Sequence, residues 1–120
     1  MIGVDIVEIG RIEELLSDQN FLHRIYTDTE LAYCQQAKTT NVVASRLAAR
    51  FAAKEAVFKA VESLKTLRWK EIEVVNEESG KPVLRFHGDT EMLLEGLSIK
   101  VEISLSHTQD YAVAAAIVAT

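Results

Sequence analysis

The sequence is poor in the residues that usually interrupt or cross-link a chain. It contains one cysteine, one proline and five glycines among 120 residues. The single cysteine, Cys34, cannot form an internal disulfide, which is typical of a reducing compartment, and we interpret it as a small packing residue. No linker rich in proline, glycine or serine and no internal repeat divides the sequence. We therefore predict a single domain over residues 1–120.

Long apolar segments are also missing. No apolar run approaches the ~20 residues that span a bilayer. The first residues do not follow the charged, apolar and small-residue order of a secretory leader. These absences predict a soluble, cytoplasmic protein with no membrane partner. Hydrophobic residues make up 48% of the chain, so it can build a packed core.

Positive charge is scarce overall, because the formal net charge is −5. Non-specific nucleic-acid binding needs a wide basic surface, so we expect no nucleic-acid partner. The basic residues gather in residues 46–59, where the single acid Glu55 accompanies Arg46, Arg50, Lys54 and Lys59. A short basic segment in an acidic chain suits a compact anion.

Hydrophobic periodicity predicts an α+β fold. The first half indicates a strand at 2–8, then helices at 10–18, 30–37 and about 42–63. The second half indicates strands at 71–75, 82–86, 99–106 and 111–119, with a short helix at 88–96. Thr27 and Glu30 have the spacing of a capping box, and Asn41 is the predicted cap of the long helix. Helices followed by antiparallel strands are typical of the α+β class.

Asp5 is an unusual residue for the interior of the predicted first strand, since strands disfavour Asp. It lies between Val4 and Ile6, and alternation places it on the opposite face, together with Gly3. The pattern leaves two interpretations open. Asp5 is either a solvated or capping carboxylate, or a functional group.

Glu55 lies in the predicted long helix, with Phe51 and Phe58 at positions i−4 and i+3. It can form an i, i+4 ion pair with Lys59, worth ~0.3–0.5 kcal/mol on an exposed helix. It can also be a metal ligand, because two carboxylates from separate elements, here Asp5 and Glu55, are a common protein share of a Mg²⁺ site. Phosphates and waters complete such a site. Spacing alone leaves both interpretations open.

Two further segments could contact a ligand. In the turn at 78–82, Gly80 suits a positive φ and Pro82 begins a strand, which is ordinary hairpin chemistry. The alternative is that its backbone N–H groups and Lys81 bind a ligand. His107, at a predicted strand end, is either a hydrogen-bonded turn residue or a binding residue.

Four segments together resemble a known family. They are GVDIVEIGRI (3–12), RLAARFAAKEAVFKA (46–60), VVNEESGKP (74–82) and SLSHTQDYAVAAAIV (104–118). In this order, from end to end, they resemble the holo-[acyl carrier protein] synthases, the small type of 4'-phosphopantetheinyl transferase. The first two segments are the specific ones. The resemblance implies the 4'-phosphopantetheinyl transferase fold, with one long helix packed on a small antiparallel sheet.

The resemblance also implies an activity. The enzyme would transfer 4'-phosphopantetheine from coenzyme A (CoA) to a serine of apo acyl carrier protein, with Mg²⁺ as cofactor and 3',5'-ADP as product, in fatty acid biosynthesis. Asp5 and Glu55 would hold Mg²⁺ and would be catalytic together with Lys59. CoA, including its 3'-phosphate, would be bound by Arg50, Lys59, Gly80, Lys81, Pro82 and His107.

The partners are implied in the same way. The acidic carrier protein would dock on Arg11, Leu15, Phe21 and Arg24, and the chain would form a homotrimer with active sites in clefts between neighbouring chains. The sequence departs from the family at Ala49, where Gly is common, and at 61–66, where a Gly-Thr-Gly loop is common.

Two other classes of function fit the same residues. One is a non-catalytic homologue that binds CoA or a carrier protein, an alternative suggested by the altered segment 61–66. The other is a metal-dependent hydrolase of phosphate esters, in which an activated water replaces the carrier serine.

Overall fold

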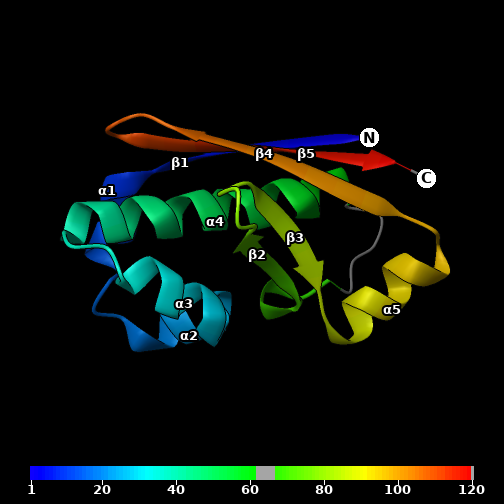
Figure 1. Ribbon diagram of the computed structural model, residues 1–120, viewed down its shortest axis with the longest axis horizontal. Coiled ribbons are helices and arrows are strands. Elements are labelled where there is room, and N and C mark those ends of the chain that lie inside the picture. Colours follow the sequence, from blue (N-terminus) through cyan, green and yellow to red (C-terminus); the bar gives the residue numbers. More distant parts are fainter. Residues whose placement is uncertain (62–66, 120) are drawn as a thin grey trace.

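The computed structural model describes residues 1–61 and 67–119. Its central element is helix α4 (Thr40–Ala60), which has a sheet on one side and the helices α2 and α3 on the other (Figure 1). The sheet is antiparallel, with the strand order β1 (Ile2–Glu8), β5 (Tyr111–Ala119), β4 (Lys100–His107). Strands β2 (Ile72–Asn76) and β3 (Pro82–Phe86) pair as a separate hairpin. The predicted α+β fold, with one long helix on a small antiparallel sheet, is confirmed.

The shorter helices differ from the prediction mainly between residues 10 and 25, and the helix predicted over 30–37 begins and ends two residues earlier, at Asp28–Gln35. They are α1 (Ile9–Glu14), α2 (Gln19–Ile25), α3 (Asp28–Gln35) and α5 (Gly88–Gly96), with a 3₁₀ turn η1 at Trp69–Glu71. The prediction of one helix over 10–18 is wrong, because α1 ends at Glu14 and Asp18 caps a helix that was not predicted. The Oδ1 atom of Asp18 accepts a hydrogen bond from the Phe21 amide at 3.0 Å.

Side-chain caps decide where the next two helices begin. The capping box is confirmed: Thr27 Oγ1 accepts from the Glu30 amide at 3.1 Å, and Glu30 Oε1 accepts from the Thr27 amide at 2.9 Å. The predicted cap Asn41 is wrong. Helix α4 is capped by Thr39, whose Oγ1 accepts from the Val42 amide at 3.2 Å. The predicted extension of this helix to 63, and most of the altered segment 61–66, lie outside the described residues.

The sheet approaches α4 closely because small residues line both surfaces. Strand β5 buries Ala112, Ala114 and Ala116, and α4 has buried alanines of its own at 44, 48, 49, 52, 53, 56 and 60. Strand β1 presents Gly3, where an added Cβ would lie 1.9 Å from the Ala56 carbonyl oxygen. The backbones of β1 and α4 therefore pack directly on each other, which fixes the distance between the strand and the helix.

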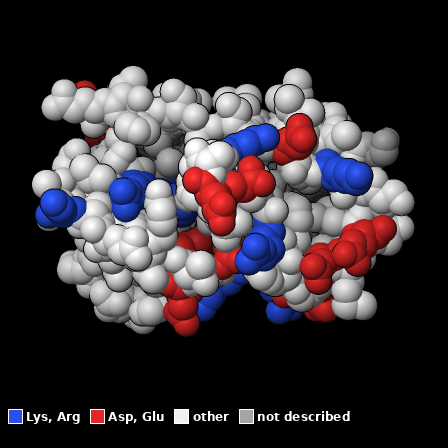
Figure 2. All heavy atoms as spheres, viewed as in Figure 1, with Lys and Arg blue, Asp and Glu red and all other residues white. Residues whose placement is uncertain are grey.

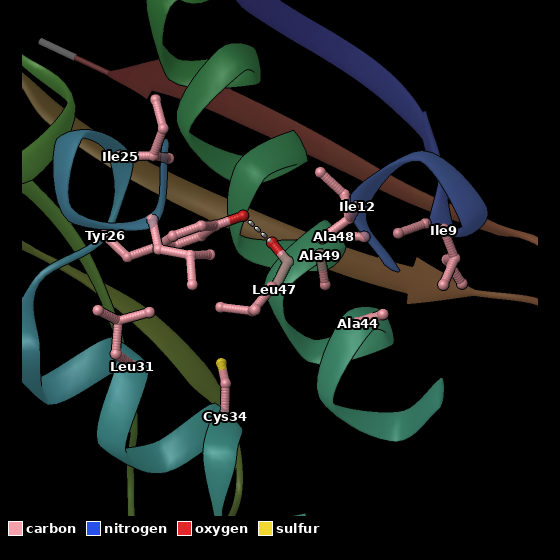
Figure 3. Close-up of a cluster of buried hydrophobic side chains, with 12 residues drawn as sticks. Ile9, Ile12, Ile25, Tyr26, Leu31, Cys34, Ala44, Leu47, Ala48 and Ala49 are labelled. Atoms are coloured by element: carbon pink, nitrogen blue, oxygen red, sulfur yellow. Dashed lines mark hydrogen bonds between the residues drawn. The ribbon is translucent and has the colours of Figure 1, made fainter. Parts of the chain in front are cut away.

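The other side of α4 is joined to α2 and α3 by an apolar cluster. Figure 3 shows Tyr26, which follows α2, pointing towards α4, where its hydroxyl donates to the Leu47 carbonyl oxygen at 2.8 Å. Ile9 and Ile12 of α1 contribute to the same cluster. The cluster holds the three short helices against the long one.

A buried ion pair reinforces this junction. The Lys54 ammonium, which is 0% exposed, donates to Glu30 Oε1 at 2.7 Å and to the carbonyl oxygens of Ile25 at 2.7 Å and Trp69 at 3.0 Å. Burial lowers the pKa of Lys54, and the Glu30 carboxylate opposes that change. Three acceptors match the three donors of an ammonium group. Lys54 is therefore a structural residue, although it lies in the basic segment 46–59.

Candidate active site

A pocket of about 310 Å³ opens between β1, α1, α2 and α4. Asp5 and Glu55 both line it. Asp5 faces α4 because Val4 and Ile6 on either side are exposed on the other face of the sheet, at 54% and 63%. This orientation is the one that alternation predicted. The two candidate carboxylates, 50 positions apart in the sequence, therefore share one pocket.

Lys59 is bonded to the first of these carboxylates. Its ammonium donates to Asp5 Oδ1 at 3.0 Å and to the Val4 carbonyl oxygen at 3.0 Å. The predicted alternative, an ion pair of Lys59 with Glu55, is wrong, since Lys59 pairs with Asp5. The Lys59 side chain is 50% exposed. An ammonium in that position can leave Asp5 without a large loss of buried contacts.

The electrostatics of the pocket favour a cation. Burial raises the pKa of the Glu55 carboxyl, the nearby charge of Asp5 raises it further, and Lys59 lowers it. A cation placed between two carboxylates that repel each other stabilises their ionised forms. A cation bound near Glu55 would therefore favour the ionised form of this carboxyl.

The donor set also indicates which cation fits. The described residues contain no group of three or more His, Cys, Asp or Glu side chains that could hold a metal ion. Mg²⁺ is commonly bound through one or two carboxylates, with substrate phosphates and waters as the other ligands. Asp5 and Glu55 fit such an ion when a phosphate ligand supplies the rest.

A second, larger pocket of about 800 Å³ lies at the opposite edge of the sheet. Four of the residues predicted to bind CoA line it: Arg50, Gly80, Pro82 and His107. Gly80 adopts φ 90°, as the turn pattern predicted, and its amide donates to the Glu77 carbonyl oxygen at 2.7 Å. Lys81 lines a third pocket, between β3 and β4. Lys59 is bonded to Asp5, which lines the first pocket.

The second pocket also contains side chains that were not predicted to bind a ligand. Tyr33, Arg46 and Asn76 line it. Asn76 Oδ1 accepts a hydrogen bond from Arg50 Nη2 at 2.5 Å. Arg46 could have been found, because it lies in the basic segment of the sequence, whereas Tyr33 gives no local signal.

The two pockets have no lining residue in common. The first takes its sheet residues from β1 and the second from β4, which are the edge strands on either side of β5. Within the described part of one chain, the predicted metal ligands Asp5 and Glu55 therefore line a different pocket from the four predicted CoA-binding residues of the second pocket.

Three of the four predicted docking residues lie beside the carboxylates. Arg11, Leu15 and Phe21 line the first pocket, whereas Arg24 is exposed on α2 and does not line it. Cys34 takes no part in either pocket, and burial raises the pKa of its thiol to about 11. Since the thiolate is the reactive form, Cys34 is a packing residue, as predicted.

On the face drawn in Figure 2, Lys and Arg side chains are interspersed with Asp and Glu side chains, so neither sign of charge dominates it. The helices in the described part of the chain include none that combines the length and apolarity of a membrane span.

The sequence and the fold of this chain match those of known proteins. The profile of the 4'-phosphopantetheinyl transferase superfamily matches residues 1–116. The holo-[acyl-carrier-protein] synthase of Koribacter versatilis is 42% identical over 96% of this chain and 94% of its own length.

Solved structures agree. The holo-(acyl-carrier-protein) synthase of Bacillus anthracis, in complex with CoA (3',5'-ADP), is 35% identical with a TM-score of 0.80, covering 98% of this chain and 93% of that one. The Helicobacter pylori synthase, in complex with coenzyme A, is 28% identical with a TM-score of 0.83, covering 99% and 100%. These matches confirm the resemblance carried by the four sequence segments. The chain belongs to the 4'-phosphopantetheinyl transferase superfamily.

Proposed function

We propose that this chain transfers 4'-phosphopantetheine from CoA to a serine of apo acyl carrier protein, depends on Mg²⁺ and releases 3',5'-ADP. The observation that carries the proposal is that Asp5 and Glu55 line one pocket and that Lys59 is bonded to Asp5. The relatives support it, since they are named for this reaction and two of their structures contain CoA or its nucleotide.

The reaction makes one bond to phosphorus and breaks another. The serine Oγ of the carrier attacks the phosphorus next to pantetheine, the P–O bond within the diphosphate breaks, and 3',5'-ADP departs with the electron pair. The serine proton passes to a carboxylate of the site or to water. This chemistry needs positioning and neutralisation of charge more than a protein nucleophile.

The residues divide these tasks. Mg²⁺ held by Asp5 and Glu55 would neutralise charge on the diphosphate. Lys59 would leave Asp5 when that carboxylate binds a cation and would place its ammonium on a phosphate oxygen instead. Its half-exposed side chain permits that movement.

Intact mass separates the three classes of function. The chain is incubated with CoA, Mg²⁺ and apo carrier protein. A carrier protein heavier by one phosphopantetheine supports the proposal. An unchanged carrier with intact CoA would favour the non-catalytic binding homologue, and hydrolysed CoA with an unmodified carrier would favour the hydrolase.

We also propose a homotrimer whose active sites lie between chains. A cleft that combines the β1 edge of one chain with the β4 edge of the next would unite the two pockets. An apolar surface suits such contacts: Ile2, Val4, Ile6 and Ile117 are 54–69% exposed on one sheet face. Of strand β5, only the odd-numbered residues lie on that face, since Ala112, Ala114 and Ala116 are buried against α4.

Ile117→Glu is therefore expected to break the assembly and the activity together, because it places a charge in the apolar contact. Sedimentation velocity measures the first effect and the transfer assay the second. Met92→Glu, at an exposed apolar residue on α5, is the control and should remain trimeric. An active monomer of the wild type at working concentration would rule the trimer out.

Carrier docking is proposed to depend on a local positive charge beside the carboxylates. The carrier is acidic and this chain has a net charge of −5, so only a basic contact can attract it. Arg11→Glu should raise the carrier KM about tenfold or more by slowing association, and leave the CoA KM unchanged. Added salt should weaken the wild type more than the variant. Arg85→Glu, exposed on β3, is the control for net charge, and an equal carrier KM in both variants would make Arg11 a structural residue only.

A further inference from the structure

Glu30 lies in a buried polar network, where its two carboxylate oxygens bond different segments of the chain. Oε1 accepts a hydrogen bond from the Lys54 ammonium of α4 at 2.7 Å, and Oε2 accepts one from the Val74 amide of β2 at 2.8 Å. Glu30 and Lys54 are 1% and 0% exposed. Hydrogen bonds to ionised groups are stronger than those between neutral groups, and burial strengthens them further. Glu30 therefore sets the distance between β2 and α4.

A second set of contacts joins the same elements one helical turn away. Arg50 precedes Lys54 by four positions on α4, and its Nη2 donates to Asn76 Oδ1 of β2 at 2.5 Å. Tyr33 follows Glu30 by three positions on α3, and the centroid of its ring is 4.6 Å from the Arg50 guanidinium carbon. Residues three or four apart share a helix face, and residues two apart share a strand face. The two sets of contacts are therefore adjacent.

The two sets differ in their relation to the second pocket. Tyr33, Arg50 and Asn76 line it, whereas Glu30 and Lys54 are not among its described lining residues. The contact between Arg50 and Asn76 depends on how β2 lies against α4. A small displacement of β2 would break this contact, because a hydrogen bond weakens steeply outside a narrow range of distance and angle.

We propose that Glu30 is a positioning residue for the second pocket. By bonding Lys54 and Val74, it holds β2 against α4 and so keeps Arg50 and Asn76 in the geometry that receives the ligand. Glu30 acts through these residues and touches no ligand itself. The inference rests on the proposed function, with the second pocket as part of the CoA site.

Two substitutions of Glu30 break its contact with Val74 in different ways. Glu30→Gln keeps the length of the side chain but turns an NH₂ group, which cannot accept, towards one of the donors. Glu30→Asp keeps the charge beside Lys54 but is one methylene shorter, so it does not reach both partners. Each variant should raise the CoA KM and weaken 3',5'-ADP binding about tenfold, as expected for a misplaced binding group, and leave the carrier KM within about twofold. Steady-state transfer measures the KM values, and calorimetry measures the nucleotide affinity.

Thr90→Val is the matched control, because it removes a buried hydrogen bond of the same kind without changing the shape of the side chain. Thr90 Oγ1 donates to Glu71 Oε1 at 2.7 Å, and Thr90 is 1% exposed and lines neither pocket. This variant should lower the urea midpoint and leave both KM values and the nucleotide affinity unchanged. Urea midpoints of all variants identify conditions in which each one is folded.

The split between the two KM values separates positioning from a general loosening of the fold. An equal rise of both KM values in the Glu30 variants, or unchanged 3',5'-ADP binding in Glu30→Asp, would overturn the inference. Transfer by the wild type with an unchanged CoA KM in both variants would overturn this inference alone. Weakened 3',5'-ADP binding by both variants of a chain that fails the transfer assay would support this inference and overturn the proposed function alone.

Discussion

Asp5→Asn and Glu55→Gln are each expected to reduce Mg²⁺-dependent transfer about a thousandfold, since a bound metal supplies several kcal/mol of charge stabilisation. The amides keep the shape of the side chains and remove the charge that holds the cation. Asp5 also loses its ion pair with Lys59, so the ammonium is no longer held at 3.0 Å from that side chain. Steady-state transfer at saturating CoA measures the loss.

Two further measurements make this assignment specific. Mn²⁺ is used in place of Mg²⁺, and its binding is measured by calorimetry in the presence of 3',5'-ADP. Both variants should bind Mn²⁺ more weakly than the wild type does, while their unfolding midpoints stay near that of the wild type. Glu13→Gln, an exposed carboxylate on α1 that does not line the pocket, is the control. Full activity of either variant at ordinary magnesium concentration would remove that residue from the metal site.

Gly3→Ala is expected to destabilise the protein by about 3 kcal/mol or more, at the upper end of the usual cost of overpacking. An added Cβ would lie 1.9 Å from the Ala56 carbonyl oxygen and 2.7 Å from the Ala60 amide nitrogen. Both contacts are backbone atoms, so no side chain can rotate away. Strand β1 must lift from α4, which also moves Asp5 away from Glu55. Urea unfolding measures the change in stability.

The matched control is Gly96→Ala, since a Cβ at this glycine of α5 meets no atom within 4 Å. It should be neutral or stabilising by about 0.4–1 kcal/mol, because alanine reduces the freedom of the unfolded chain. Equal unfolding midpoints for the two variants would show that β1 does not pack directly on α4.

Local sequence patterns predicted most of the helices and strands, and they also predicted which face of the first strand carries Asp5. Strict alternation in residues 2–8 put Asp5 on the face opposite Val4 and Ile6, and the structure places it against α4. Helix α2 was not predicted because it begins with polar residues at 19 and 20, which weaken its apolar periodicity. Its one clear sequence signal is the capping residue Asp18.

The sequence by itself determined the α+β class, the family and the candidate carboxylates, because periodicity and motif order are properties of neighbouring residues. Only the tertiary structure decided which basic residues remain free. Lys54 pairs with Glu30, 24 positions away, and Lys59 pairs with Asp5, 54 positions away. Arg46 and Arg50 lie against Tyr33 and form no ion pair with a carboxylate in the described part of the chain. It also decided that the two predicted metal ligands and four of the residues predicted to bind CoA line separate pockets, at opposite edges of the sheet. Ion pairing and cavity membership depend on distances between remote segments, and local sequence carries no information on those distances.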